Sequence, residues 1–122
     1  MSERNLLWTT SDPRGFRVSL AADVWKHIVA QHTEFEPYFD TIRITIENPD
    51  EIYFDAKSTQ TKSTGSQIYA YYRARLLTGE FENDMVYVSV KFVQENSRLQ
   101  GYVQTAFSTN RIQQRMRRLW QR

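Results

Sequence analysis

The chain has 122 residues, enough for one domain with a sizeable hydrophobic core. Hydrophobic residues make up 40% and aromatic residues 14% of it, with only four Gly and three Pro, which excludes a disordered or collagen-like chain. The absence of Cys excludes disulfides, thiolate catalysis and Cys-ligated zinc, and no apolar run approaches the roughly 20 residues that cross a bilayer. We therefore expect one cytoplasmic domain without a secretion signal or membrane contact, made of an N-terminal arm (residues 1–15) and a folded part (residues 16–122).

The net charge of +2 conceals an asymmetry along the chain. Residues 1–90 carry nine Lys or Arg against thirteen Asp or Glu, whereas residues 91–122 carry seven against one. A basic end favours a polyanionic partner, because clustered Arg and Lys attract phosphates. A solvated terminal helix whose late arginines complement the helix dipole explains the same charges, and on charge alone it is the simpler interpretation.

Residues 16–19 are predicted to form a short strand that leads directly into a helix over residues 20–31. The helix is indicated by apolar side chains that recur at helical spacing on one side, while polar side chains lie on the other. The apolar set is Leu20, Val24, Trp25, Ile28 and Val29.

The next segment, residues 38–47, fits two structures. Ile42, Ile44 and Ile46 alternate as they would in a strand, but the apolar residues of the segment also fit a helix. Pro37 is typical of a first helical turn, and the Asn-Pro pair that follows the segment is a natural stop. We therefore predict a helix here.

The rest of the chain is predicted to be mainly strand. Val, Ile, Tyr and Phe alternate with other residues over residues 51–55, 67–76, 85–92 and 99–108, and a short polar connection makes the last two an antiparallel hairpin. A final helix is predicted from Asn110, a good N-cap. Its buried stripe would be Ile112, Met116, Leu119 and Trp120, and a second stripe would be Arg111, Arg115, Arg118 and Arg122.

This order of elements, β-α-α-β-β-β-β-α, predicts an α+β fold with an antiparallel four-stranded sheet and helices packed on one face. Strand alternation then assigns each side chain to a face of the sheet. The core side is expected to receive Ile68, Ala70, Tyr72, Ala74, Val86, Val88, Val90, Phe92, Leu99, Val103, Thr105 and Phe107. The open side is expected to carry Tyr69, Tyr71, Arg73, Arg75, Tyr87, Ser89, Lys91, Tyr102, Gln104 and Ser108.

The expected open side has cations and tyrosines but no acid. Tyrosine rings stack on unpaired bases, and Arg or Lys side chains hold the intervening phosphates, so we predict that this face binds RNA. The RNA-binding residues would be Tyr69, Tyr71, Arg73, Arg75, Tyr87 and Tyr102. The alternative is an ordinary solvent-exposed sheet face, in which Tyr and Arg are common.

His27 and His32 are the candidate proton-transfer groups. They are five residues apart on one helix and so point about 140° apart, unlike the i, i+4 pair of a helical zinc site. The chain also has no Gly-rich phosphate loop, so we predict neither a metal site nor a cofactor. His27 lies beside Asp23, which could orient it as a general base, and His32 lies where the helix ends. As a surface histidine and a helix-end imidazole, the two also have purely structural explanations.

Cleavage of RNA without a metal needs few groups. A base takes the 2′-hydroxyl proton, an acid protonates the leaving 5′-oxygen, and a cation stabilises the crowded phosphorane. The candidates for these roles are His32 or His27, Lys91 or Arg73, and the hydroxyl of Thr105 or Ser108. Thr105 also has a structural explanation, because alternation turns it toward the core.

Four segments together resemble a known family: VWKHIVAQHTEF (24–35), IENPDEIYFD (46–55), YVSVKF (87–92) and YVQTAFST (102–109). They are similar to phage and mobile-element nucleases of the barnase–EndoU–colicin–RelE-like fold group, over roughly residues 16–110. The resemblance implies a toxin-like α+β domain that cleaves RNA, often tRNA or mRNA, without a metal, and that has a cognate antitoxin or immunity protein as a further partner. It also implies an active site made of His32, Lys91 and Thr105, with Ser108 nearby, although Thr33 stands where the family has Pro.

The resemblance and the strand alternation agree on Lys91 and disagree on Thr105. A β-bulge near Gly101 would move Thr105 to the open side. Two other hypotheses stay open. One is a non-catalytic RNA- or protein-binding module on the same scaffold, and the other is an interaction protein that docks a partner through the apolar stripe of its last helix.

Overall fold

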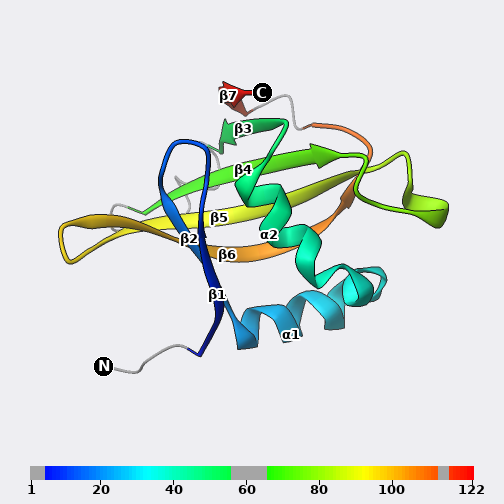
Figure 1. The fold of residues 1–122 in the computed structure, drawn as a ribbon, viewed down its shortest axis with the longest axis horizontal. Helices are drawn as coiled ribbons and strands as arrows, with labels where there is room; N and C mark the ends of the chain where they lie inside the picture. The colour runs from blue at the N-terminus through cyan, green and yellow to red at the C-terminus, as the bar shows by residue number, and fades with distance from the viewer. Residues whose placement is uncertain (1–4, 56–65, 113–115) are drawn as a thin grey trace.

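The computed structural model describes residues 5–55, 66–112 and 116–122, which form a seven-stranded sheet and two α-helices (Figure 1). The strands are β1 (Leu6–Ser11), β2 (Arg17–Ala21), β3 (Glu51–Phe54), β4 (Gln67–Ala74), β5 (Met85–Glu95), β6 (Arg98–Thr109) and β7 (Arg117–Gln121). The helices are α1 (Ala22–Gln31) and α2 (Phe39–Glu47), with the short 3-10 helices η1 (Thr33–Tyr38) and η2 (Gly79–Phe81). The predicted α+β class and the first two predicted helices are confirmed.

The sheet has the strand order β1-β2-β6-β5-β4-β3-β7. Its described neighbours are antiparallel except for β2 and β6, which run parallel. The prediction of a four-stranded, wholly antiparallel sheet was wrong. Four strands, β3 to β6, lie where they were expected. The sheet is wider than predicted because β2 and β1 extend it beyond β6, and β7 extends it beyond β3.

Both ends of the chain differ from the prediction. Residues 6–11, expected within an N-terminal arm, form β1 as the outer strand of a hairpin with β2. The predicted final helix is wrong, because Arg117–Gln121 form β7, which pairs with β3. Trp120 packs against the core from this edge strand. Arg115 lies outside the described residues.

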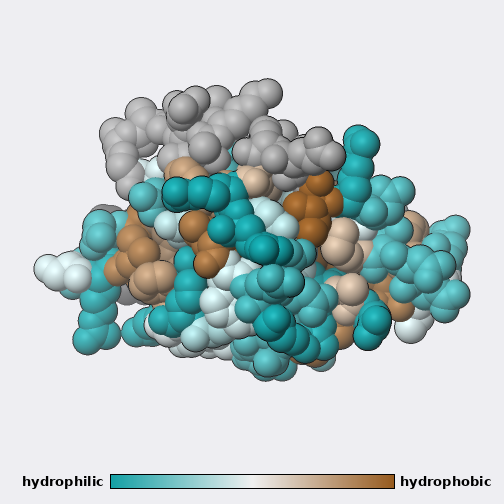
Figure 2. Space-filling model, turned by 90° about the horizontal axis from the view of Figure 1, so that it is seen from above, coloured by the Kyte–Doolittle hydropathy of each residue, from teal (hydrophilic) through white to brown (hydrophobic). Residues whose placement is uncertain are grey.

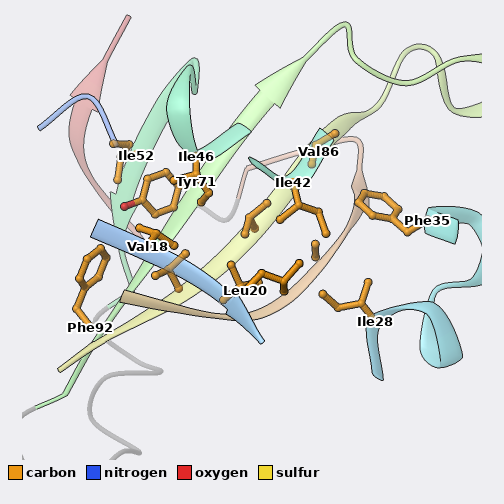
Figure 3. Packing of buried hydrophobic residues seen from close by; sticks show 14 of the residues in the cluster. Val18, Leu20, Ile28, Phe35, Ile42, Ile46, Ile52, Tyr71, Val86 and Phe92 are labelled. Carbon is orange, nitrogen blue, oxygen red and sulfur yellow. The ribbon is translucent and has the colours of Figure 1, made fainter. Parts of the chain in front are cut away.

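The main core lies between one face of the sheet and the helices (Figure 3). α2 crosses that face, and α1 runs beside β6 (Figure 1). Ile42 and Ile46 of α2 and Ile28 of α1 are fully buried, because the helical spacing of these apolar residues directs them at the sheet. The alternate β5 residues Val86, Val88, Val90 and Phe92 are buried in the same cluster, as predicted.

A smaller apolar cluster lies on the opposite face of the sheet, which we name the far face. Ala70, Tyr72, Tyr87 and Met116 are buried in it, and Tyr53, Met85, Phe107 and Ile112 pack against them. Two members of the predicted docking stripe, Ile112 and Met116, therefore face the sheet. In the described part of that stripe, Leu119 is the exposed residue, at 38%.

The turn between β1 and β2 carries a buried polar network on the helix side of the sheet. Arg14 donates to the Asp12 carboxylate from Nε and Nη2, at 3.0 and 2.8 Å. The hydroxyl of the fully buried Tyr71 donates to the same carboxylate at 2.7 Å. The Arg14 guanidinium also lies over the rings of Phe16 and Tyr69. We name Asp12, Arg14 and Tyr71 the turn network.

No helix within the described ranges has the length and apolar character to span a membrane. On the side of the molecule that lies uppermost in Figure 1, hydrophilic residues predominate and hydrophobic ones form separate patches (Figure 2).

Candidate functional site

A groove of about 470 Å³ is hollowed into the far face where β5, β6 and α1 meet. Its lining residues are Val24, Lys91, Val93, Glu95, Tyr102, Val103 and Gln104. Lys91 and Tyr102 are cross-strand partners, and they lie on the far face because their neighbours Val90, Phe92 and Val103 are buried in the main core. Val24 closes the groove from the first turn of α1. We name this feature the β5–β6 groove.

A β-bulge in β6 shapes the groove. Ser89 pairs with Thr105 and the next residue, Val90, pairs with Val103, so Gln104 is the extra residue. Because of this insertion, Val103 faces the core while Thr105 faces the other way, on the far face. The alternation-based prediction that Thr105 points into the core was therefore wrong. The bulged residue lies three positions after Gly101, and it moves Thr105 to the far face as a bulge near Gly101 would.

The same bulge changes the positions of two other predicted residues. Phe107 pairs with Tyr87 and packs with the far-face cluster, although the alternation assigned it to the core. Ser108 pairs with the core residue Val86 and so lies on the helix side of the sheet. Of the two candidate hydroxyls, Thr105 is the one that shares a face with Lys91.

Lys91 is the cation of the groove. It is half-buried, and among the described residues its side chain makes no ion pair or hydrogen bond. Glu95 lines the same groove, and the Tyr102 hydroxyl lies 2.8 and 2.9 Å from its two carboxylate oxygens. At the bulge, the Ser89 hydroxyl donates to Oε1 of Gln104 at 3.3 Å. The groove thus holds a lysine without an ion pair, an acid that accepts from a tyrosine, and both polar and valine side chains.

The two histidines lie on α1 and at its end, beside β6. The His32 ring is 5.2 Å from the ring of Phe107, and its Nδ1 is 4.0 Å from the Glu34 carboxylate. His27 is exposed and lies one helical turn after Val24, a residue of the groove. His32 thus lies against the C-terminal part of β6, two residues beyond Thr105.

Lys91, Thr105 and His32 do not meet at one point. Successive same-face residues of a strand are about 7 Å apart, so the Lys91–Tyr102 pair and the Tyr87–Phe107 pair are separated by roughly 13 Å. Thr105 lies between them, opposite Ser89. The structure therefore lines up the three predicted residues along the far face, and it does not bring Lys91 within hydrogen-bond distance of His32.

The predicted RNA-binding face of tyrosines and arginines does not form as a unit. In β4 the alternation was assigned to the wrong faces: Tyr69, Tyr71 and Arg73 pair with β5 residues of the main core and lie on the helix side. Arg73 donates to the carbonyl of Asn48 at 2.6 Å. The physical reason is that β4 is buried on both faces, so its apolar pattern does not distinguish them.

The other predicted RNA-binding residues lie in different places. Tyr87 is 9% exposed within the far-face cluster, and Arg75 is exposed beyond the end of β4. Tyr102 is the one of the six that lines the groove. The sequence reasoning missed Glu95 and Val24 as groove residues, because only the strand pairing and the position of α1 bring them beside Lys91.

Within the described parts of the chain, no three His, Asp or Glu side chains come together in a way that could hold a metal ion. Comparison of the chain with protein-family models, with curated proteins and with solved structures gave no match.

Proposed function

We propose that this protein is a metal-independent endoribonuclease of the toxin or mobile-element type, which cleaves tRNA or mRNA bound along the β5–β6 groove. The observation that carries the proposal is that Lys91 lines the β5–β6 groove without an ion pair among the described residues, and that Thr105 lies on the same face of the sheet, next to the lining residue Gln104. An unpaired, half-buried cation in a concave surface is suited to an anionic ligand, and RNA supplies phosphates at regular spacing.

The proposed reaction is attack of the ribose 2′-oxygen on the adjacent phosphorus. The bond from phosphorus to the 5′-oxygen breaks, and the products carry a 2′,3′-cyclic phosphate and a 5′-hydroxyl. A base removes the 2′-hydroxyl proton and an acid returns a proton to the leaving 5′-oxygen, so the reaction is balanced without a metal or cofactor. Lys91 stabilises the negative charge of the phosphorane, and Thr105 donates a hydrogen bond to it.

The linear arrangement of the candidates sets the position of the RNA. The proposal puts the reacting phosphate over Thr105, with Lys91 on one side and the His32 imidazole on the other. Lys91 can approach from its side because its ammonium sits on a flexible four-carbon stem. His27, one turn after Val24, is the second candidate base. An enzyme of this kind acts in the cytoplasm, where a cognate antitoxin or immunity protein would restrain it.

The test is incubation of the full chain with mixed tRNA and mRNA in EDTA, with the product ends identified by mass spectrometry. We expect 2′,3′-cyclic phosphate ends. Lys91→Ala should lower kcat/KM by about 100-fold or more, as expected for loss of a charge that stabilises the transition state. His32→Ala should lower it by a similar factor, as expected for loss of a proton-transfer group.

Lys26→Ala is the matched control, because Lys26 is an exposed lysine on α1 outside the groove. It should cleave at the wild-type rate. Cleavage that requires a divalent metal, or a Lys91→Ala variant as active as the Lys26→Ala variant, would contradict the proposed mechanism.

A non-catalytic RNA-binding module is the second candidate. It is favoured by one observation, the roughly 13 Å between the Lys91 and Phe107 positions, which leaves His32 away from the groove cation. RNA binding that depends on Lys91, with no products from any RNA, would establish this second function.

A further inference from the structure

We propose that Arg17 and Arg98 form a second phosphate-binding subsite, which holds a nucleotide of single-stranded RNA remote from the cleaved bond. This inference rests on the proposed function, because it extends the RNA-binding surface of the β5–β6 groove.

The subsite is a hollow of about 270 Å³ at the hairpin end of β5 and β6. It is lined by Arg17, Glu95, Asn96, Arg98, Leu99 and Gln100. Asn96 and Ser97 have φ values of 51° and 64°, which fit the tight turn of a two-residue hairpin. That turn sets Arg98 opposite Glu95, and the parallel pairing of β2 sets Arg17 beside Gln100.

The hollow adjoins the β5–β6 groove. Glu95 lines both, so a strand of RNA that follows the groove from Lys91 reaches the two arginines. Lys91 and Glu95 are four residues apart on β5, which corresponds to roughly 13 Å. One phosphate cannot contact both ends of this surface. The ligand must therefore be an oligonucleotide, with different phosphates at Lys91 and at the arginines.

The charges of the hollow favour a phosphate. Arg98 has Glu95 as its cross-strand partner, and that carboxylate stays charged while it accepts from the Tyr102 hydroxyl, so the lining carries two arginines against one acid. Within the described ranges, neither Arg17 nor Arg98 makes a side-chain hydrogen bond or ion pair, and both are exposed. Two guanidinium groups are thus left available at one hollow, and Arg is suited to bidentate phosphate contacts.

The wall between the arginines is fixed. The Gln100 side-chain amide donates to the Ser19 hydroxyl at 3.1 Å and to the Gly101 carbonyl at 2.8 Å. Ser19 also shares a hydrogen bond with the Thr9 hydroxyl of β1, at 2.7 Å. The polar side chains of the β1–β2–β6 side of the sheet therefore bond to one another, and the arginines project beside them.

The experiment measures binding rather than cleavage. Fluorescein-labelled 2′-O-methyl oligonucleotides cannot undergo 2′-hydroxyl attack, and their binding to the full chain is followed by fluorescence anisotropy from about 50 to 200 mM salt. The double variant Arg17→Gln/Arg98→Gln removes both charges and keeps side chains of similar polarity. We expect its Kd to rise about 10-fold. The slope of log K against log salt should fall by about 1.4, because each phosphate that an arginine neutralises adds about 0.7 to that slope for single strands.

The matched control is Lys26→Gln/Arg43→Gln, which removes the same charge from α1 and α2, away from both hollows. It should bind as the wild type does. A series of oligonucleotides from two to about ten nucleotides gives a second measurement. The affinity of the wild type should increase with length, and the Arg17→Gln/Arg98→Gln variant should lose most of that increase.

The outcomes separate this inference from the proposed function. If no RNA is cleaved but the double variant loses affinity and salt dependence, the subsite stands and the nuclease proposal fails. If RNA is cleaved in a Lys91-dependent manner but both double variants bind with the same Kd and slope, the subsite is overturned and the nuclease stands. Wild-type protein that binds no oligonucleotide at any of these salt concentrations overturns the subsite as well.

Discussion

The turn network and the β5–β6 groove are both polar regions on this sheet, and they differ in how their charges are satisfied. In the turn network, the carboxylate of Asp12 has no exposed surface and accepts hydrogen bonds from Arg14 and Tyr71. In the groove, Lys91 is half-buried and makes no ion pair within the described chain, although Glu95 lines the same groove. The first cluster serves the fold, whereas the second leaves a cation available to a ligand.

Burial explains why the first cluster is structural. A buried ion must be paired and hydrogen-bonded, and removal of one partner leaves the other charge uncompensated. A cation at a concave surface keeps part of its hydration, so it can remain unpaired in the folded state and exchange that water for a phosphate. The comparison therefore predicts large stability effects in the turn network and functional effects in the groove.

Substitutions in the turn network should destabilise the protein most. Asp12→Ala should lower the free energy of unfolding by about 3–5 kcal/mol, because it leaves the partly buried Arg14 and the buried Tyr71 hydroxyl without their acceptor. Urea denaturation at pH 7 measures it. Glu82→Ala, an exposed acid in the β4–β5 connection, is the control and should change stability by no more than about 0.5 kcal/mol. If the two substitutions lower the free energy of unfolding equally, the turn network does not have the structural role assigned to it.

Tyr71→Phe should lower stability at pH 7 by about 2 kcal/mol, because it removes a hydrogen bond to a charged group. Burial, and then the Asp12 carboxylate, raise the pKa of Tyr71 well above its ordinary value, against the opposite influence of Arg14. The folded state therefore holds this proton after the unfolded chain has lost it near pH 10, so wild-type stability should fall as the pH rises above about 10.

In the Tyr71→Phe variant, the contribution of this group to the alkaline loss of stability is absent. Urea denaturation of both proteins at pH 7 and pH 11 measures the difference. The difference between their free energies of unfolding should be smaller at pH 11 than at pH 7. An equal difference at the two pH values would show that Tyr71 does not keep its proton in the folded protein.

Beside the groove, Thr105→Val should lower kcat/KM for the proposed RNA cleavage by about 10-fold, because it removes the proposed hydrogen-bond donor to the phosphorane while largely preserving shape. Ser108→Ala is the matched control, since the bulge leaves Ser108 on the helix side. Rate measurements under single-turnover conditions, with thermal unfolding of each variant, test the pair. If Ser108→Ala lowers the rate and Thr105→Val does not, the far face of the sheet does not carry the reaction.

Glu95, the acid shared by both hollows, should have a weaker influence than the residues above. Glu95→Gln removes a negative charge from the proposed RNA surface, so RNA should bind about 3-fold more tightly at low salt. Glu36→Gln, at an exposed position of η1, is the control. Weaker binding by the Glu95→Gln variant would indicate that the carboxylate itself contacts the RNA.

The elements that could be predicted are those whose two sides differ in composition. α1 and α2 show their apolar side at helical spacing, and the alternation in β5 correctly separated Val88 from Lys91. Over residues 86–92 of β5, the aliphatic side chains all lie on one side, although Tyr87 and Ser89 on the other side are also buried. Lys91 was assigned to the correct face because of this contrast.

The rest of the arrangement depends on tertiary contacts. β4 is apolar on both faces, so Tyr71 was assigned to the open side although its ring lies in the core. Gln104 has no residue-type signal that marks it as a bulge, and only the pairing with β5 shows the extra residue. β7 pairs with β3, which is distant in sequence, and its apolar residues fit a helix as well as a strand.

The parallel pairing of β2 with β6 has a consequence for when the proposed RNA surface can form during synthesis. Arg17 and its partner Gln100 are 83 positions apart in the chain. Contacts between such distant segments carry a large loop-closure cost and form slowly compared with local hairpins. A nascent chain whose β6 residues are still in the ribosome has neither the β5–β6 hairpin nor a partner strand for Arg17. The proposed RNA surface can therefore form only after β6, and so after both helices, has left the ribosome.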